Sequence, residues 1–217
     1  MTKNTDISKL RREYSLKTLD EKSVSRNPYE QFSEWMNDAL KLRILDPTAM
    51  TIATSDKNGN PSIRTVLLKG FGDDGFIFFT NYKSQKGSEI LSNPNVEVLL
   101  FWKEIERQVR ISGKAKKIPV KESEEYFHSR PLESQIAAIS SMQSKIIPNR
   151  KYLEDSFLNV KNKFKGKEIP LPPFWGGFKV IPDYFEFWQG RENRLHDRIV
   201  YSKSKSKSNW IIARLSP

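Results

Sequence analysis

Residues 191 to 198 read RENRLHDR and bring three arginines together with one of the two histidines of the chain. Guanidinium groups bind carboxylates and phosphates through paired hydrogen bonds, and an imidazole exchanges protons near neutral pH. In a strand, Arg194, His196 and Arg198 would share one face, whereas a helix would align the three arginines. The apolar IVY that follows favours a turn and then a strand. The stretch therefore predicts an anion site on that strand face, against the alternative of a solvated loop, and leaves Arg191 in solvent.

Two other segments combine cations with apolar or hydroxyl residues. RTVLLK at residues 64–69 encloses apolar residues between Arg64 and Lys69. Burying an unpaired charge is costly, so each cation either lies in water at a strand end or meets an anion. TNYKSQKG at residues 80–87 resembles a second anion site, because Ser84 stands where a helix N-cap leaves backbone amides free for phosphate. Neither segment identifies a ligand by itself.

Tyr126, Arg130 and Ser134 recur at intervals of four residues in YFHSRPLESQ. Pro131 interrupts a continuous helix, so the segment is better interpreted as one helix, a break and the start of another. A phenol, a guanidinium and a hydroxyl that converge near a helix start would bind a phosphate monoester. The alternative is an ordinary capped corner between two helices.

The composition limits the functions that these residues could serve. The chain has 217 residues, 37% of them apolar, with 37 Lys and Arg against 26 Asp and Glu and a net charge of +11. The absence of cysteine excludes disulfides, thiol nucleophiles and cysteine-ligated metals, and two histidines are too few for a histidine-rich metal site. A positive net charge is compatible with nucleic acid, an anionic membrane surface or phosphorylated small ligands and does not choose among them. Because the cations are embedded in apolar strands and not spread over one face, we expect no nucleic acid. No segment is apolar enough for a signal peptide or a membrane span, which predicts a cytoplasmic protein.

Hydrophobic patterning predicts the elements that position these residues. A helix is expected from Asn27 and Pro28 onward. The expected strands are AMTIATS, SIRTVLLK, GFIFFTN, NVEVLLFW, RQVRISGKAKKI, GGFKVIPDYFEFWQG, RLHDRIVYS and NWIIARLS. The first of them are joined by turns too short for parallel crossovers. Further helices are expected at SQKGSEILSN, PVKESEEYFHS, PLESQIAAISSMQS and NRKYLEDSFLNVKNKF, and an exposed hairpin tip at SKSKSKS, residues 202–208. The pattern predicts an α+β fold built on an antiparallel barrel.

Several long and rare stretches occur in a characteristic order: LRREY, RTVLLKG, FTNYKSQKG, ERQVRISGKA, YFHSRPLESQIAA, MQS, PLPPFWGGFKV, EFWQG and RLHDR. Through them, nearly the whole chain resembles the pyridoxine/pyridoxamine 5'-phosphate oxidase family. The resemblance implies an antiparallel split β-barrel of the FMN-binding flavoprotein type with surrounding helices, and a homodimer with FMN at the interface. It also implies oxidation of pyridoxine 5'-phosphate or pyridoxamine 5'-phosphate to pyridoxal 5'-phosphate, with dioxygen reduced to hydrogen peroxide.

The resemblance also implies a role for individual residues. The FMN contacts would be Arg64, Thr65, Val66, Leu67, Leu68, Lys69, Phe79, Thr80, Gln85, Lys86, Gln108, Gln143, Ser144, Trp188 and Arg198. The substrate contacts would be Arg11, Arg12, Glu13, Tyr14, Lys69, Tyr126, Arg130, Ser134, Arg194, Leu195 and His196. Among these, Arg194 and His196 would be catalytic, and Arg198 is expected to stabilise the charge of the reduced flavin. Residues 1–26 would form a mobile flap over the active site, and residues 27–217 a single FMN-binding domain.

The chain departs from the family pattern at a few positions. Gln85 stands where the family usually has an arginine, while Ala137 and Ile139 replace a glycine and a tryptophan near the flavin. The alternative within the same fold is an FMN oxidase that acts on another substrate, such as those of phenazine biosynthesis. Because every residue of the set expected around the substrate phosphate is present, the vitamin B6 reaction is favoured.

Overall fold

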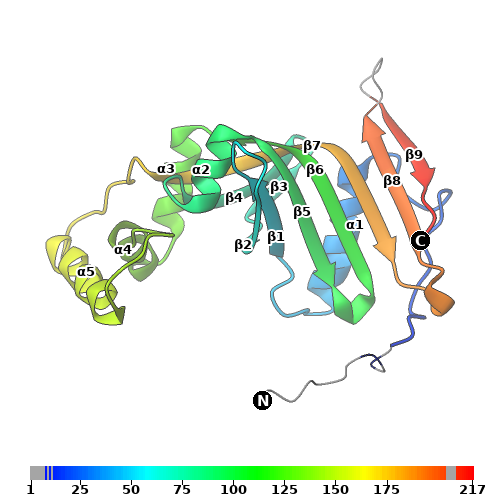
Figure 1. Ribbon diagram of the computed structural model, residues 1–217, viewed down its shortest axis with the longest axis horizontal. Helices are drawn as coiled ribbons and strands as arrows, with labels where there is room; N and C mark the ends of the chain where they lie inside the picture. The colour runs from blue at the N-terminus through cyan, green and yellow to red at the C-terminus, as the bar shows by residue number, and fades with distance from the viewer. Residues whose placement is uncertain (1–7, 9, 11, 204–208) are drawn as a thin grey trace. The chain divides into compact units, whose positions relative to one another are not determined.

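The computed structural model describes residue 8, residue 10, residues 12–203 and residues 209–217 (Figure 1). The chain forms two compact units. The central unit comprises Thr48–Leu100 and Ile111–Asp183, and the terminal unit comprises Met1–Pro47, Phe101–Arg110 and Tyr184–Pro217. Three strands have residues in both units: β5 (Asn95–Trp102), β6 (Arg107–Lys117) and β7 (Trp175–Gln189).

The central unit is built on an antiparallel sheet. Its strands β1 (Ala49–Ser55), β2 (Pro61–Leu67), β3 (Gly70–Gly72) and β4 (Gly75–Asn81) join β5, β6 and β7 in the order β2-β1-β5-β6-β7-β4-β3. β1 and β2 form a hairpin in which Ile52 pairs with Arg64. The turn between them is closed by Asp56, whose carboxylate accepts from the backbone of Asn58 and Asn60, and by Gly59, whose φ of 84° is left-handed. The β1–β2 hairpin therefore has the turn chemistry that its sequence predicts.

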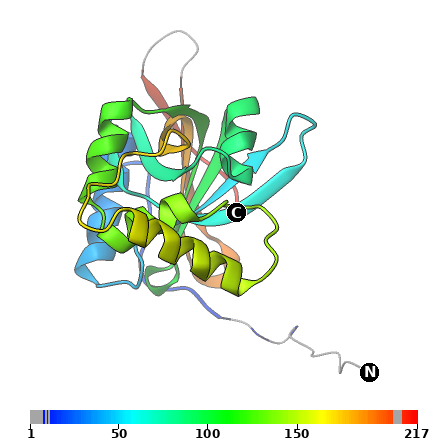
Figure 2. The same ribbon diagram turned by 90° about the vertical axis from the view of Figure 1, so that its left-hand side faces the viewer.

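Four helices complete the central unit: α2 (Gln85–Ser92), α3 (Val120–Ser129), α4 (Leu132–Ser140) and α5 (Arg150–Lys163). The Ser84 side chain caps α2 by accepting from the backbone N–H of Gly87 at 3.2 Å. Arg130 is extended and Pro131 is the N-cap residue of the next helix, so α3 and α4 are separated by the predicted break. Helix α5 lies beside α4 (Figure 2). Phe127, Ile136 and Trp175 are buried together beneath these helices.

The terminal unit contains α1 (Pro28–Lys41), β8 (Asp197–Lys203) and β9 (Trp210–Arg214) with the adjoining ends of β5, β6 and β7. Asn27 caps α1 through its side chain, and the apolar face of the helix is buried, with the Trp35 ring edge-on to Phe187 at 5.2 Å. β8 pairs antiparallel with both β7 and β9. Two single turns of 3-10 helix, η1 (Lys103–Ile105) and η2 (Glu192–Arg194), connect the strands.

The predicted elements agree with the observed ones, to within a few residues at their ends, except at three places. The strand expected to begin at Arg194 begins at Asp197, because Asn193 and Arg194 have left-handed φ values of 56° and 61°. Helix α4 ends at Ser140, whereas PLESQIAAISSMQS was expected to be helical to its end, and the short strand β3 was not expected. The β8–β9 hairpin is confirmed, although residues 204–208 of its tip lie outside the described residues. Among the described helices, none has the length and apolar character that a bilayer crossing requires.

Candidate functional site

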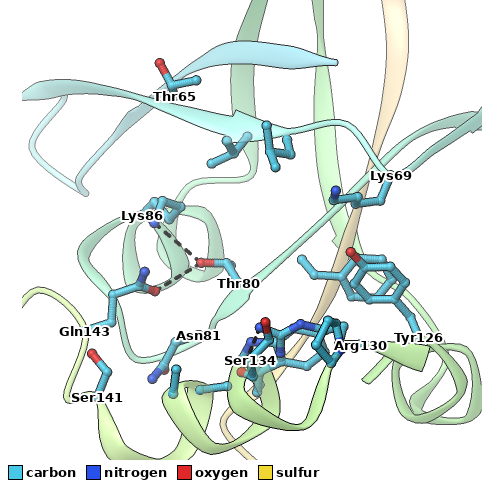
Figure 3. A pocket seen from close by; sticks show the side chains of 17 residues that line it. Thr65, Lys69, Thr80, Asn81, Lys86, Tyr126, Arg130, Ser134, Ser141 and Gln143 are labelled. Carbon is cyan, nitrogen blue, oxygen red and sulfur yellow. Dashed lines mark hydrogen bonds between the residues drawn. The ribbon is translucent and has the colours of Figure 1, made fainter. Parts of the chain in front are cut away.

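The central unit contains a cavity of about 560 Å³ between β2, β4 and the start of α4 (Figure 3). Residues from three separate predicted motifs meet there. Of the predicted site residues, Thr65, Val66, Leu67, Lys69, Phe79, Thr80, Lys86, Tyr126, Arg130, Ser134 and Gln143 line it. Among the described residues that line the cavity, Lys69, Lys86 and Arg130 are the cations and none is a carboxylate. Lys86 is buried, Arg130 is half-buried and Lys69 is exposed at the cavity. An excess of positive charge at one cavity favours the binding of an anion.

Arg130 is the most constrained cation of the cavity. Its Nη2 donates to the backbone oxygen of Ser134 at 2.9 Å, and its guanidinium lies 4.7 Å from the centre of the Trp175 ring. Nη1 is buried and has no hydrogen-bond partner within the described part of the chain. Burial lowers the pKa of Arg130 below its ordinary value, which still leaves the group charged at neutral pH. A buried N–H that lacks an acceptor costs stability unless a ligand supplies one.

An aromatic wall stands beside this guanidinium. The rings of Phe79 and Tyr126 stack at 3.8 Å with an angle of 18°, and Trp175 is parallel to Tyr126 at 6.2 Å. Burial raises the pKa of Tyr126 above its ordinary value, so the phenol stays protonated and keeps its O–H donor. The cavity thus offers a flat apolar surface for a ring together with donors for an anion (Figure 3).

Lys86 and Thr80 form a second polar group across the cavity. Lys86 Nζ donates to Thr80 Oγ1 at 3.4 Å, and Thr80 Oγ1 donates to Gln143 Oε1 at 3.3 Å (Figure 3). Burial, followed by repulsion from Arg64, lowers the pKa of Lys86 from its ordinary value. This ammonium is 8% exposed as a residue and lies in the first turn of α2, where the helix dipole also favours an anion.

Four predicted cofactor contacts of the central unit do not line the cavity. Arg64 donates to Thr54 and forms an ion pair with Glu89 at 3.4 Å, so this cation meets an anion within the protein. Leu68 is buried in the core, and Gln85 donates to the other oxygen of Glu89 at 2.9 Å. Ser144 is exposed, next to the lining residue Gln143. Glu89 thereby engages two of the residues that the resemblance assigned to FMN.

The remaining predicted residues belong to the terminal unit. The rings of Trp188 and His196 lie 4.7 Å apart, and the Tyr14 ring stands edge-on to each of them at 5.7 Å. His196 Nδ1 accepts from the backbone N–H of Arg191 at 3.1 Å, which leaves Nε2 as the protonated nitrogen of the neutral ring. Leu195 is 68% exposed. Trp188, His196 and Tyr14 therefore form a compact aromatic cluster, and we call it the His196 cluster.

The arginines around the His196 cluster differ in their partners. Arg191, which was expected in solvent, forms an ion pair with Asp197 at 3.0 Å, so that expectation was wrong. Arg198 is paired with the buried Glu186 at 2.8 Å, and this bond raises the pKa of Arg198 above its ordinary value. Arg194 is exposed, outside the strand, and has no ion pair among the described residues. Arg194 and His196 therefore do not lie on a strand face as predicted, because the turn with the left-handed Asn193 and Arg194 precedes β8.

The N-terminal predictions are described in part. Arg12 is paired with Glu106 at 3.2 Å, and the Glu13 carboxylate accepts from the backbone N–H of Asn193 at 3.4 Å. Arg11 lies outside the described residues. Gln108 is half-buried on β6, in the terminal unit.

Several residues at these sites were not predicted from the sequence. Trp175 lines the cavity, and its signal was the FWGG motif, whose Gly176 has no room for a Cβ because the Tyr82 hydroxyl would lie 2.2 Å away. Glu106 and Asp197 hold the segments around the His196 cluster, yet charged residues in a turn are ordinarily solvated. Their burial depends on partners far away in the sequence.

Comparisons with known protein families and sequences agree along the chain. The family model described as pyridoxamine 5'-phosphate oxidase matches residues 36–164, and that of the pyridoxine 5'-phosphate oxidase C-terminal dimerisation region matches residues 175–217. The pyridoxine/pyridoxamine 5'-phosphate oxidase of Trichormus variabilis is 49% identical over 97% of this chain and 98% of that protein.

Solved structures with a similar fold include PhzG from Burkholderia lata in complex with tetrahydrophenazine-1-carboxylic acid. It is 27% identical, has a TM-score of 0.87, and the match covers 94% of this chain and 100% of PhzG. An FMN-binding protein from Nostoc punctiforme, related to pyridoxamine 5'-phosphate oxidase, has a TM-score of 0.69 at 16% identity, covering 90% of this chain and 99% of that protein. These similarities confirm the predicted fold class, the α+β split β-barrel of the FMN-binding flavoproteins.

Proposed function

Since the chain is an enzyme that belongs to the pyridoxine/pyridoxamine 5'-phosphate oxidase family, we propose that it oxidises pyridoxine 5'-phosphate or pyridoxamine 5'-phosphate to pyridoxal 5'-phosphate. In this reaction FMN is the cofactor, dioxygen is reduced to hydrogen peroxide, and the amine substrate also consumes water and releases ammonia. The observation that carries the proposal is the cavity with three cations and no carboxylate, where Arg130 Nη1 lacks an acceptor. A phosphate monoester supplies that acceptor and balances the charge.

The two cationic groups of the cavity suit two phosphorylated molecules. We assign Lys69, Tyr126, Arg130 and Ser134 to the phosphate of the substrate. Lys86 and Thr80, at the start of α2, would hold FMN together with Gln143. FMN supplies the hydride-accepting chemistry, and the residues of the chain bind, orient and shield the reactants.

For the residues of the terminal unit we propose the roles that membership of the family suggests. His196 has its Nδ1 occupied by a backbone donor, so its Nε2–H is the group left to hydrogen-bond a substrate oxygen or nitrogen. Arg194 has no ion pair among the described residues and is available to an anionic or electron-rich group. Trp188 and Arg198 are assigned to FMN, and residues 12–14, with Arg11, to a flap over the substrate.

We propose that the enzyme acts as a homodimer, as the matched dimerisation region suggests.

The alternative is an FMN oxidase of the same fold that acts on another substrate. PhzG, whose fold is similar, is seen with a phenazine carboxylic acid, which has no phosphate. The unmatched Arg130 Nη1 and Lys69, which lines the same cavity, favour a phosphorylated substrate for this chain. The two functions therefore differ in whether the phosphate is required.

The visible spectrum of the purified protein, followed by peroxide release, tests the proposal. After incubation with FMN and removal of free cofactor, the protein should stay yellow and release one hydrogen peroxide for each pyridoxine 5'-phosphate oxidised. Unphosphorylated pyridoxine is the matched control and should react poorly. A protein that cannot retain FMN would refute the oxidase assignment, and one that retains FMN but prefers an unphosphorylated substrate would support the alternative.

A further inference from the structure

Glu106 occupies an unusual position in the terminal unit, between η1 and β6. Its backbone φ of 57° is left-handed, a conformation that long side chains adopt rarely and at a cost. The residue is only 2% exposed. Its backbone oxygen accepts from the N–H of Gly190 at 2.8 Å and from the Gln189 side chain at 3.2 Å. The turn at Glu106 is therefore fastened to the end of β7.

The carboxylate of Glu106 is turned toward the N-terminal segment. It accepts from the backbone N–H of Ser15 at 3.0 Å, from that of Leu16 at 3.1 Å and from Arg12 at 3.2 Å. Residues 12–16, which we call the strap, belong to no helix or strand. The strap is therefore not held by the hydrogen bonds of a β-sheet. Instead, three donors of the strap bind the one buried carboxylate of Glu106.

The strap carries Tyr14 into the His196 cluster. From the other side, Gly190 sets the place of Tyr14, because a Cβ on Gly190 would lie 2.8 Å from the Cβ of Tyr14. Glu106 and Gly190 therefore fix the position of the phenol ring from both sides. The ring in turn stands edge-on to His196, the residue that the proposed function assigns to the substrate.

We propose that Glu106 is a positioning residue for the reaction. Its carboxylate anchors the strap so that Tyr14 and His196 are held in the arrangement that receives the substrate. Glu106 acts through the strap and touches no reactant. This inference rests on the proposed function for its effect on turnover, whereas the anchoring of the strap by Glu106 is independent of it.

Replacement of Glu106 tests the anchor directly. Hydrogen exchange of the full-length, FMN-loaded protein should show the strap amides of Ser15 and Leu16 exchanging at least about tenfold faster in Glu106→Ala than in the wild type, because a hydrogen bond to a charged acceptor is lost. Glu106→Gln should fall between the two, since its amide oxygen still accepts. Glu104→Gln, at an exposed position of the same turn, is the matched control and should leave the exchange unchanged.

Loss of the anchor should change the kinetics with the substrate and leave FMN binding unchanged. In Glu106→Ala, kcat/KM for pyridoxine 5'-phosphate should fall about tenfold, mostly through KM, while the Kd for FMN stays within about twofold. Gly190→Ala should give the same KM increase with the carboxylate intact, because it displaces Tyr14 from the other side. This second variant decides the question if Glu106→Ala fails to fold.

The outcomes separate the two proposals. Unchanged exchange at Ser15 and Leu16 in Glu106→Ala would overturn the anchor, whatever the activity. Faster exchange with unchanged KM and kcat would overturn the positioning role. A wild-type protein with no oxidase activity would refute the proposed function, and the exchange experiment would still show whether Glu106 anchors the strap.

Discussion

The cations of the cavity and the cations around the His196 cluster are treated differently by the protein. In the cavity, Lys69, Lys86 and Arg130 share a lining that has no carboxylate. Around the His196 cluster, Arg191 is paired with Asp197 and Arg198 with Glu186, while Arg194 has no such partner among the described residues. The cations of the cavity are thus an excess of positive charge, whereas the arginines around the His196 cluster are largely neutralised by carboxylates.

The difference separates ligand binding from fold stability. A half-buried cation that is paired with a carboxylate holds two segments together, and removing it leaves the buried acid without its partner. A half-buried cation that is unpaired costs stability until a ligand neutralises it. The partners of a cation therefore predict whether its loss is felt in ligand affinity or in the free energy of unfolding.

The largest effect is expected at Arg130, whose free Nη1 we assign to the substrate phosphate. In Arg130→Ala, the KM for pyridoxine 5'-phosphate should increase about 10- to 100-fold, since charge-assisted hydrogen bonds contribute about 1.5–3 kcal/mol. Steady-state peroxide release measures it. Arg150→Ala, at an exposed arginine of α5 paired with Glu154, is the control and should leave KM unchanged. An equal loss with unphosphorylated pyridoxine would show that Arg130 does not bind the phosphate.

Arg194 and Arg198, four residues apart in the sequence, test the comparison within the RENRLHDR segment. Arg194→Ala should reduce turnover about tenfold or more while the free energy of unfolding stays within about 0.5 kcal/mol, because the side chain is exposed and has no ion pair among the described residues. Arg198→Ala should lower the free energy of unfolding by about 1–3 kcal/mol, since Glu186 loses one partner, and should also weaken FMN retention. Urea unfolding and FMN titration of both variants measure these effects. If Arg198→Ala were as stable as Arg194→Ala, the pairing would not stabilise the fold.

Asp197 tests the paired group through its pH dependence. Desolvation alone would raise its pKa, but hydrogen bonds from Leu19, Arg214 and Arg191 outweigh it and the pKa is lowered. Its stabilisation is therefore present above the unfolded pKa of about 3.9 and is lost as the pH falls through the folded pKa. Asp197→Asn should destabilise the protein by about 1–3 kcal/mol at pH 7, and the gap should close below pH about 3.9.

Urea unfolding at a series of pH values measures this gap. Asp73→Asn, at an exposed aspartate in the β3–β4 turn, is the control and should show no gap at any pH. A gap for Asp197→Asn that persists unchanged at pH 3.5 would mean that the charge of Asp197 does not stabilise the fold.

Much of the fold could be predicted because alternation and turn chemistry are local. AMTIATS alternates in burial over Ala49–Ser55, and Asn27 and Ser84 cap their helices as their sequences indicate. The strand start at Asp197 could not be predicted in this way. Asn193 and Arg194, which precede it, have left-handed φ values, whereas the residue types of this segment alternate as they would in a strand.

The residues of the cavity were easier to predict from the sequence than the residues that support the His196 cluster. The cavity residues come from motifs with unusual combinations of cations and hydroxyls, and Lys69, Tyr126, Arg130 and Ser134 line one cavity. The supporting acids were not predictable, because Glu106 is buried by a segment about 90 positions away in the chain. A charged residue in a turn carries no local signal of such a partner.

The smallest effect has the opposite sign and concerns Lys86. Burial lowers the pKa of this ammonium in the folded protein. Its charged form therefore destabilises the ligand-free protein at every pH below the folded pKa. The destabilisation disappears as the pH rises from the folded pKa toward the unfolded pKa of about 10.4. Lys86→Met keeps the apolar stem and should stabilise the FMN-free protein by about 1 kcal/mol at pH 7 while weakening FMN binding. Thermal unfolding without FMN and fluorescence titration with FMN measure the two changes, and Lys83→Met, at an exposed lysine just before α2, should alter neither. If Lys86→Met is more stable and binds FMN poorly, the unpaired charge of Lys86 serves ligand binding at a cost in stability. If Lys86→Met is less stable, Lys86 stabilises the fold as the ion-paired arginines do, and the cavity does not differ from the His196 cluster in this respect.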